Sequence, residues 1–165
     1  MRSIIHGGCD ILNSMHTHMN YSRITDQIYI GTNFCCGTHF DPELLKQGVV
    51  YDLSLEEGRV DSPVGAAAYL WLPIEDMHAP TEQQFFMGIS FIDTAIKSGR
   101  KVYVHCKNGH GRAPTMVAGY FIANGSTTDE AIALIARKRP EIHLQSIQID
   151  ALRRFEQAYR EQKRA

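Results

Sequence analysis

The chain has 165 residues, of which 44% are hydrophobic, and this suffices for one domain with an ordinary buried core. The formal net charge is -1, so no global positive field attracts nucleic acid or an anionic membrane. We therefore expect no nucleic-acid binding and no stable membrane association, and any preference for anions must come from a local site. Composition leaves the oligomeric state open.

The four cysteines form no disulfide pattern, and two of them are adjacent: Cys9, Cys35, Cys36 and Cys106. We therefore predict a reduced, cytoplasmic protein. Residues 1–22 hold only scattered apolar positions, which make neither a signal-peptide core nor a membrane span. We expect an N-terminal extension of unknown role over residues 1–22 and one folded domain over residues 23–165.

The first regular pattern is an alternation over residues 24–31, which predicts a half-buried strand that ends at a glycine. Further along, Asp41 is a good N-cap acceptor and Pro42 suits the first helical position. These two residues predict a short helix that Gly48 ends. A buried strand is expected directly afterwards, over residues 49–53.

The next apolar run, residues 67–74, predicts another strand. A capping box that begins at Thr81 then opens a helix with apolar residues at helical spacing, and Gly99 marks its end. The short run over residues 101–106 predicts one more strand. Glycines follow it at once.

Three helices are predicted in the remainder of the chain. One ends at Ala123, a second begins with a capping box at Thr127 and ends before Pro140, and a third follows from Ile147. Strands thus come early and helices late, with strand-to-helix crossovers between them. This order predicts an α/β domain with a mostly parallel central sheet flanked by helices.

The segment with the strongest chemical indication is His-Cys-Lys-Asn-Gly-His-Gly-Arg, residues 105–112. Because it follows a strand and opens a helix, unpaired backbone N–H groups point outward at the positive end of the helix dipole. Gly109 and Gly111 let the backbone turn tightly and approach a ligand. We therefore predict a nest for a tetrahedral oxyanion. Its phosphate-binding residues would be Lys107, Asn108, Gly109, His110, Gly111 and Arg112.

Cys106 would lie at the base of this nest, where the same field favours the thiolate. Arg112 would close the ring with a planar, two-pronged donor that suits phosphate oxygens. A lone cysteine at the end of a buried strand is usually just a small hydrophobic residue. The two spaced glycines and the arginine at a strand-to-helix switch favour the chemical interpretation instead.

A cysteine followed by five residues and an arginine resembles the signature of the protein tyrosine phosphatase superfamily. Residues 24–31 look like the opening strand of dual-specificity phosphatases, and residues 72–80 are similar to the general-acid loop of their compact, archaeal-type members. Arg139-Pro140 resembles the turn before the last helices. The resemblance covers roughly residues 23 to 160. It implies a phosphotyrosine protein phosphatase-like fold and a cysteine-based phosphatase catalytic domain over residues 23–165.

By that resemblance, Cys106 attacks phosphorus and forms a phosphocysteine, while the loop amides and Arg112 hold the equatorial oxygens. Asp76 protonates the leaving oxygen and then acts as a base toward water in the second step. The plain alternative for Asp76 is a solvated loop residue. No cofactor and no metal are implied, because thiolate and arginine do what metals do in other phosphatases.

Several other residues have roles that the sequence leaves open. The nearest substitutes for the general acid are Glu75 and, more weakly, His78. His105 would orient the nucleophile's backbone and tune its charge, or it is simply a satisfied core histidine. Gln145 or Gln148 could position the hydrolytic water. The plain alternative is that both are surface glutamines.

One residue departs from the family pattern, because Ala113 stands where Ser or Thr usually follows the loop arginine. That hydroxyl normally stabilises the thiolate as it leaves the phosphoenzyme. Thr115 is two positions further along the helix and is expected to point elsewhere. The hypothesis is an enzyme whose second step is slow, with phosphocysteine accumulating.

Two potential cations inside the loop, Lys107 and His110, are similar to those of phosphoinositide phosphatases of the superfamily. Against this, Lys107 alone is common in protein-directed members, and a histidine is mostly neutral near pH 7. The chain also has no polybasic run. We therefore expect phosphotyrosine and other phosphoprotein or aryl phosphate substrates first, including phosphoserine and phosphothreonine, and phosphoinositides second.

Functions of other classes remain as alternatives. A non-catalytic phosphate-binding pseudophosphatase is suggested by Ala113, whereas sulfur transfer or arsenate reduction would not explain Asp76 together with Arg112. The pairs Cys35-Cys36 with His39 and His16 with His18 fit no common zinc spacing. A redox role, in which Cys35 or Cys36 resolves oxidised Cys106, is a further hypothesis.

Overall fold

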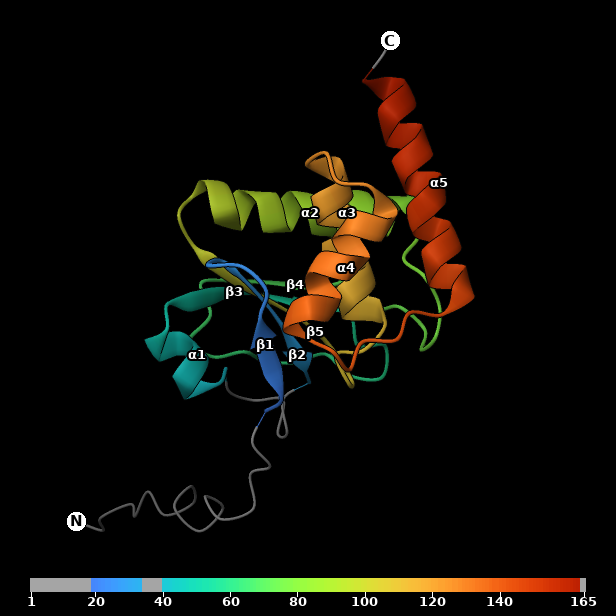
Figure 1. Ribbon diagram of the computed structural model, residues 1–165. Helices are drawn as coiled ribbons and strands as arrows, with labels where there is room; N and C mark the ends of the chain where they lie inside the picture. Colours follow the sequence, from blue (N-terminus) through green and yellow to red (C-terminus); the bar gives the residue numbers. More distant parts are fainter. Residues whose placement is uncertain (1–18, 34–39, 164–165) are drawn as a thin grey trace, which may run out of the picture.

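The computed structural model describes residues 19–33 and 40–163, which form a five-stranded sheet between helices (Figure 1). The strands are β1 (Tyr21–Arg23), β2 (Ile28–Thr32), β3 (Val49–Ser54), β4 (Ala68–Trp71) and β5 (Lys101–Cys106). Their order across the sheet is β1-β2-β5-β3-β4, and β1 alone runs antiparallel to its neighbour. The predicted α/β fold with a mostly parallel sheet is confirmed.

The helices lie on both faces of this sheet. They are α1 (Pro42–Lys46), α2 (Glu82–Lys97), α3 (Arg112–Ala123), α4 (Thr128–Lys138) and α5 (Ser146–Gln162). The short α1 packs on β3 from one side. On the other side α3 lies on β5 and β2, and α2, α4 and α5 pack around α3 (Figure 1). The helix that follows the predicted loop is thus the centre of the larger layer.

Strand alternation divides the apolar residues between two cores. Val102 and Val104 of β5 point into the large core beneath α3, whereas Tyr103 points into a smaller core with Leu44 of α1. This follows from the period of two in a strand, where successive side chains leave opposite faces. Because β5 is covered on both faces and paired on both edges, its carboxyl end is held firmly.

The predicted helix starts are confirmed by their caps. Asp41 accepts a hydrogen bond from the backbone N–H of Glu43 at 2.8 Å at the start of α1. Thr81 and Thr127 each form a complete capping box with the residue three positions later, at the starts of α2 and α4. Each cap satisfies backbone N–H groups that the first turn leaves without a partner.

The prediction of one strand over residues 24–31 is wrong in its first half. The backbone N–H groups of Ile24 and Thr25 both donate to the carbonyl of Ile28, at 2.9 and 3.2 Å, and the Thr25 hydroxyl accepts from two later N–H groups. The alternation therefore includes a turn, and β2 begins only at Ile28. The antiparallel strand β1 precedes the turn, so the sheet starts at Tyr21, ahead of the predicted domain boundary at residue 23.

Some predictions concern residues outside the described ranges. These are the bulk of the N-terminal extension and the residues considered for a metal or redox role, His16, His18, Cys35, Cys36 and His39. Within residues 19–33 and 40–163, no group of three or more His, Cys, Asp or Glu side chains is arranged to hold a metal ion. The helices in those ranges include none that is long and apolar enough to cross a membrane.

Candidate active site

The predicted loop joins the last residue of β5 to the first residue of α3. Cys106 ends the strand and is only 2% exposed, while Arg112 begins the helix. Gly109 has a φ of +67°, and a β-carbon on it would lie 2.6 Å from the carbonyl oxygen of Gly31. Only glycine fits this turn without strain. The tight turn predicted from the glycines is therefore present at Gly109.

Arg139, at the end of α4, binds this loop from behind. Its Nε donates to the carbonyl of Gly109 at 2.8 Å, and its Nη2 donates to the carbonyl of Asn108 at 3.3 Å. In a trans peptide the N–H points away from the C=O, so the amides of Gly109 and His110 face away from Arg139. This orientation gives the loop the exposed N–H groups that an anion nest needs.

The same arginine connects the loop to the sheet edge. Its Nη1 donates to the side chains of Asn20 at 2.9 Å and Ser22 at 3.3 Å, and lies 3.2 Å from a carboxylate oxygen of Glu141. Arg139 is fully buried, and these partners account for its charge and donors. The sequence singled out Arg139 only as part of a turn before the last helices. Its hydrogen-bond partners lie far away in the chain, so the sequence alone could not show that it supports the loop.

Arg112 is oriented by a backbone carbonyl and a carboxylate beside its guanidinium. Its Nη1 donates to the carbonyl of Ile74 at 2.8 Å, and its Nη2 lies 3.1 Å from Oδ1 of Asp76. Its Nε is buried and has no hydrogen-bond partner among the described residues. A buried donor without a partner is costly, so this N–H is a natural contact for a phosphate oxygen.

Asp76 lies in the loop that follows β4, as the sequence predicted, and its side chain is 60% exposed. Its backbone N–H donates to Oε1 of Glu57 at 3.0 Å, and its Oδ1 also accepts from the N–H of Met77 at 3.1 Å. Met77 has a φ of +63°, which is unusual for a residue with a side chain. These contacts fix the carboxylate beside Arg112.

A cavity of about 210 Å³ brings the predicted residues together. It is lined by Asp76, Met77, Cys106, Asn108, His110, Gly111, Arg112, His143, Gln145 and Gln148. Lys107 is exposed and neither it nor Gly109 lines the cavity, so their binding roles stay predictions. Glu75 and His78, the substitutes for the general acid, do not line it either. His143 was not singled out from the sequence.

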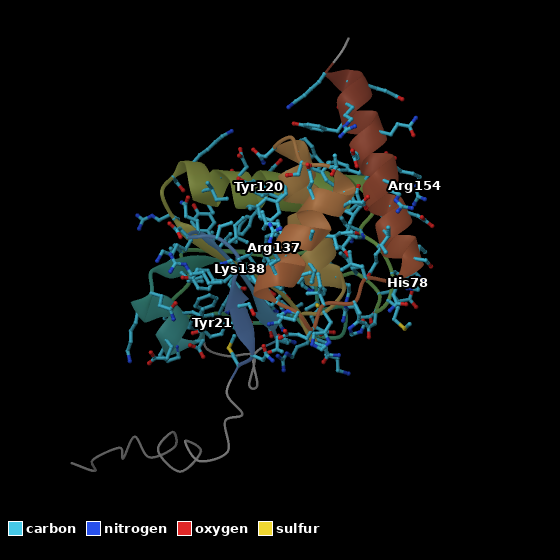
Figure 2. The ribbon with its side chains drawn as sticks, viewed as in Figure 1. Tyr21, His78, Tyr120, Arg137, Lys138 and Arg154 are labelled. Atoms are coloured by element: carbon cyan, nitrogen blue, oxygen red, sulfur yellow. The ribbon has the colours of Figure 1, made fainter. Side chains whose placement is uncertain are left out.

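Gln148 connects three parts of the site. It is buried, its Nε2 donates to the carbonyl of His78 at 2.9 Å, and its Oε1 accepts from the N–H of Gln145 at 2.9 Å. A β-carbon on Gly111 would lie 3.1 Å from the same Oε1. Figure 2 shows His78 beside the N-terminal end of α5, from which Gln148 reaches it. Gln148 is therefore no surface glutamine, while its role toward water stays a prediction.

His105 lies on the opposite face of β5 from the core under α3. It is fully buried, with Nε2 3.2 Å from Oδ1 of Asp52 and 3.9 Å from Oδ2 of Asp61, and its ring stacks on Tyr103. Burial raises the pKa of the Asp52 carboxyl, and attraction to His105 opposes that change. These contacts anchor the strand that carries Cys106, so they fit a positioning role.

The residues after Arg112 provide no hydroxyl group in the place where the family usually has Ser or Thr. Ala113 is fully buried and brings no hydroxyl to the loop. The Thr115 hydroxyl donates to the carbonyl of Gly111 at 2.8 Å, one turn back along α3. It is therefore engaged inside the helix, as its position predicted.

Comparison with known proteins identifies the family of this chain. The chain matches the model of the dual specificity phosphatase catalytic domain over residues 29–158. The human phosphatidylglycerophosphatase and protein-tyrosine phosphatase 1 is 39% identical over 77 residues, which are 46% of this chain and 38% of the relative. The Schizosaccharomyces pombe tyrosine-protein phosphatase yvh1 is 35% identical over 98 residues, which are 58% of this chain and 30% of the relative. These matches span well under half the length of either relative.

Solved structures agree in fold. The structure of PTPMT1 in complex with PI(5)P superposes with a TM-score of 0.76 at 24% identity, covering 87% of this chain and 98% of that one. Human DUSP28 superposes with a TM-score of 0.77 at 18% identity, covering 86% and 99%. The predicted resemblance is thereby confirmed, and the chain belongs to the dual specificity phosphatase catalytic-domain family of the protein tyrosine phosphatase superfamily.

Proposed function

We propose that this protein hydrolyses phosphate monoesters through a phosphocysteine intermediate on Cys106. The observation that carries the proposal is the shared cavity, where Cys106, the unpartnered Nε of Arg112 and the carboxylate of Asp76 meet among the described residues. A nucleophile, an oxyanion donor and a proton donor in one polar cavity are the parts that this reaction requires.

In the first step, the thiolate of Cys106 forms a bond to phosphorus while the bond from phosphorus to the ester oxygen breaks. Asp76 gives its proton to that leaving oxygen, which departs as an alcohol. In the second step, Asp76 takes a proton from water, the water oxygen bonds to phosphorus, and the thiolate leaves. Inorganic phosphate is released, and the proton that Asp76 took from water restores its acid form for the next cycle.

Arg112 serves both steps by stabilising charge on the equatorial oxygens. Its bond to the Ile74 carbonyl fixes the guanidinium plane before substrate arrives, so little reorganisation accompanies the reaction. The loop amides that Arg139 turns away from itself supply further donors. Asp76 Oδ1 lies 3.1 Å from Nη2 of Arg112, so the proton donor would be close to a phosphate that Arg112 binds.

Phosphotyrosine and other phosphoprotein or aryl phosphates remain the first substrates that we propose. A specific observation favours phosphorylated polyols such as phosphoinositides as the second candidate. The lining of the cavity is polar except for Met77 and Cys106, and no aromatic ring other than histidine is among its residues. The names of a phosphatidylglycerophosphatase relative and of a PI(5)P complex in the same fold support this candidate as well.

The test compares kcat/KM for a phosphotyrosine peptide, a phosphothreonine peptide and a short-chain soluble phosphoinositide, each in the presence of a chelator. We expect hydrolysis in chelator, the phosphotyrosine peptide to be the best substrate, and loss of all three activities in Cys106→Ser. A clear preference for the phosphoinositide would favour the second candidate. No hydrolysis of any substrate by the unaltered protein would favour the phosphate-binding pseudophosphatase.

A further inference from the structure

Two histidines from different segments meet at the phosphate cavity. His110 comes from the loop between β5 and α3, and His143 comes from the segment between α4 and α5. Their ring centroids are 5.1 Å apart, and the backbone N–H of His143 donates to the carbonyl of His110 at 3.0 Å. Both line the cavity, so the backbone bond holds two imidazoles at the place where we propose that the substrate binds.

The surroundings of His110 disfavour its charged form. Burial lowers the pKa of His110, and the nearby charges of Arg139 and His143 lower it further, whereas Glu141 acts in the opposite direction. Asp76 and Arg112, which pair with each other, also face the cavity. A dianion beside His110 would act in the opposite direction and favour its protonated form.

The scissile phosphate does not require these rings. Arg112 and the loop amides already provide donors for its oxygens. The histidines are therefore available to a second anionic group of the same molecule. The polar remainder of the lining, with Gln145 and Asn108, offers hydrogen bonds to hydroxyl groups rather than a wall for an aromatic ring.

We propose that His110 and His143 bind the second phosphate of a polyol bisphosphate, and that they make the preference for such substrates increase as the pH falls. The inference rests on the proposed phosphatase function and adds a specificity determinant to it. Protonated imidazoles form charge-assisted hydrogen bonds to phosphate, which are about twice as strong as neutral ones. A neutral imidazole still donates one N–H group to a phosphate oxygen but brings no charge.

The experiment measures kcat/KM for a soluble inositol bisphosphate and for the matching monophosphate at about pH 5.5 and 7.5, on either side of an ordinary histidine pKa. We expect the ratio of bisphosphate to monophosphate to rise by about tenfold at the lower pH, which corresponds to one added charge-assisted bond. His143→Gln should abolish this rise, because Gln keeps hydrogen bonding but carries no charge at either pH.

Lys138→Gln is the matched control, because it removes one exposed cation next to Arg139 and outside the cavity. It should show the same rise as the unaltered protein. Titration of the substrates themselves cancels in the comparison between variants. An equal ratio at both pH values, the same rise in His143→Gln, or a rise confined to a doubly phosphorylated peptide would overturn the proposal.

A binding measurement separates this inference from the proposed function. Calorimetric titration of Cys106→Ser with the inositol bisphosphate needs no turnover. We expect tighter binding at pH 5.5 than at pH 7.5, relative to the monophosphate, and loss of this difference when His143→Gln is added. If hydrolysis fails but this difference is found, the anion site stands without the catalytic role. If both ligands bind alike at both pH values, the histidine site is excluded whatever the activity.

Discussion

Asp76 and Arg112 form an ion pair in the site, and their unequal burial suits them to the different tasks that we propose for them. Arg112 is 2% exposed and is held by the Ile74 carbonyl, whereas the side chain of Asp76 is 60% exposed. A buried, oriented guanidinium suits charge stabilisation, and an accessible carboxylate suits proton exchange with a leaving group and with water. The two residues therefore predict different kinetic effects.

For Asp76→Asn we expect kcat to fall by about 10²–10⁴ with a poor leaving group such as an alkyl alcohol, because proton donation is lost. With p-nitrophenyl phosphate the loss should be much smaller, since that leaving group departs without a proton. Initial rates on the two substrates measure the difference.

Glu75→Gln is the matched control for this measurement. Glu75 is the neighbouring carboxylate, but it pairs loosely with His78 at 3.8 Å and does not line the cavity. Its replacement should leave both rates close to those of the unaltered protein. If Glu75→Gln instead shows the leaving-group effect and Asp76→Asn does not, the general acid has been misassigned.

Ala113 leads to a prediction about the second step. Without a hydroxyl at this position, and with that of Thr115 engaged by Gly111, the thiolate that departs in the proposed second step would lack one donor. Quenched-flow kinetics should show a burst of alcohol followed by a slower steady rate. Ala113→Ser should abolish the burst and raise the steady rate, within the range of about 10²–10³ that one such donor can contribute. A steady rate without a burst, and no gain in Ala113→Ser, would contradict this account.

The residues of the site differ in how far the sequence reveals them. Cys106, Gly109 and Arg112 can be recognised in the sequence because their proposed roles depend on spacing within one loop. Arg139 and His143 are not, because their roles depend on contacts with the loop carbonyls and with His110, which only folding brings together. The role of a buried arginine or of a histidine pair can be recognised only when the residues around it are known.

At the scale of elements, the sequence predicts helix starts better than strand ends. A capping box is a local signal, because the two residues that make it are only three positions apart. Thr81 and Thr127 each begin such a box in the structure. The strand β1 is short and antiparallel at the sheet edge, and its pairing partner lies beyond a turn. Alternation alone could not separate that turn from the strand β2.

The packing of α5 on the start of α4 depends on one carboxylate. Oε2 of Glu156 accepts hydrogen bonds from the N–H and the hydroxyl of Thr128 at 2.8 and 2.7 Å, and Oε1 lies 2.6 Å from Arg160. Burial acts to raise the pKa of Glu156, but the bonds from Thr128 and the charge of Arg160 outweigh it and leave the pKa below its ordinary value of 4.5. The carboxylate form therefore stabilises the fold.

We predict that Glu156→Gln lowers the free energy of unfolding by about 1 kcal/mol at pH 7. Because the folded pKa is below the unfolded one, this stabilisation is present above pH 4.5 and disappears as the pH falls through the folded value. Urea unfolding should thus show a smaller difference between the two proteins near pH 3.5. Glu161→Gln, exposed on the same helix, should change little; equal effects of Glu156→Gln at both pH values would contradict the prediction.

At the scale of the whole molecule, the order of the strands determines where the candidate active site lies. β5 lies between β2 and β3 and runs parallel to both, so Cys106 emerges at the carboxyl edge in the middle of the sheet. The loop with Asp76 follows β4, which ends at the same edge, and such edges are where open α/β sheets bind ligands. The sequence predicts parallel strands, but it does not give their order, which depends on long-range packing.

The phosphoenzyme is the most direct test of the central claim, which is covalent catalysis by Cys106. The protein is mixed with ³²P-labelled phosphotyrosine peptide, quenched in acid within milliseconds, digested and mapped by mass spectrometry. We predict a phosphate on the sulfur of Cys106, more of it than in Ala113→Ser, and none in Cys106→Ser. Label on another residue, or undiminished hydrolysis by Cys106→Ser, would contradict the account.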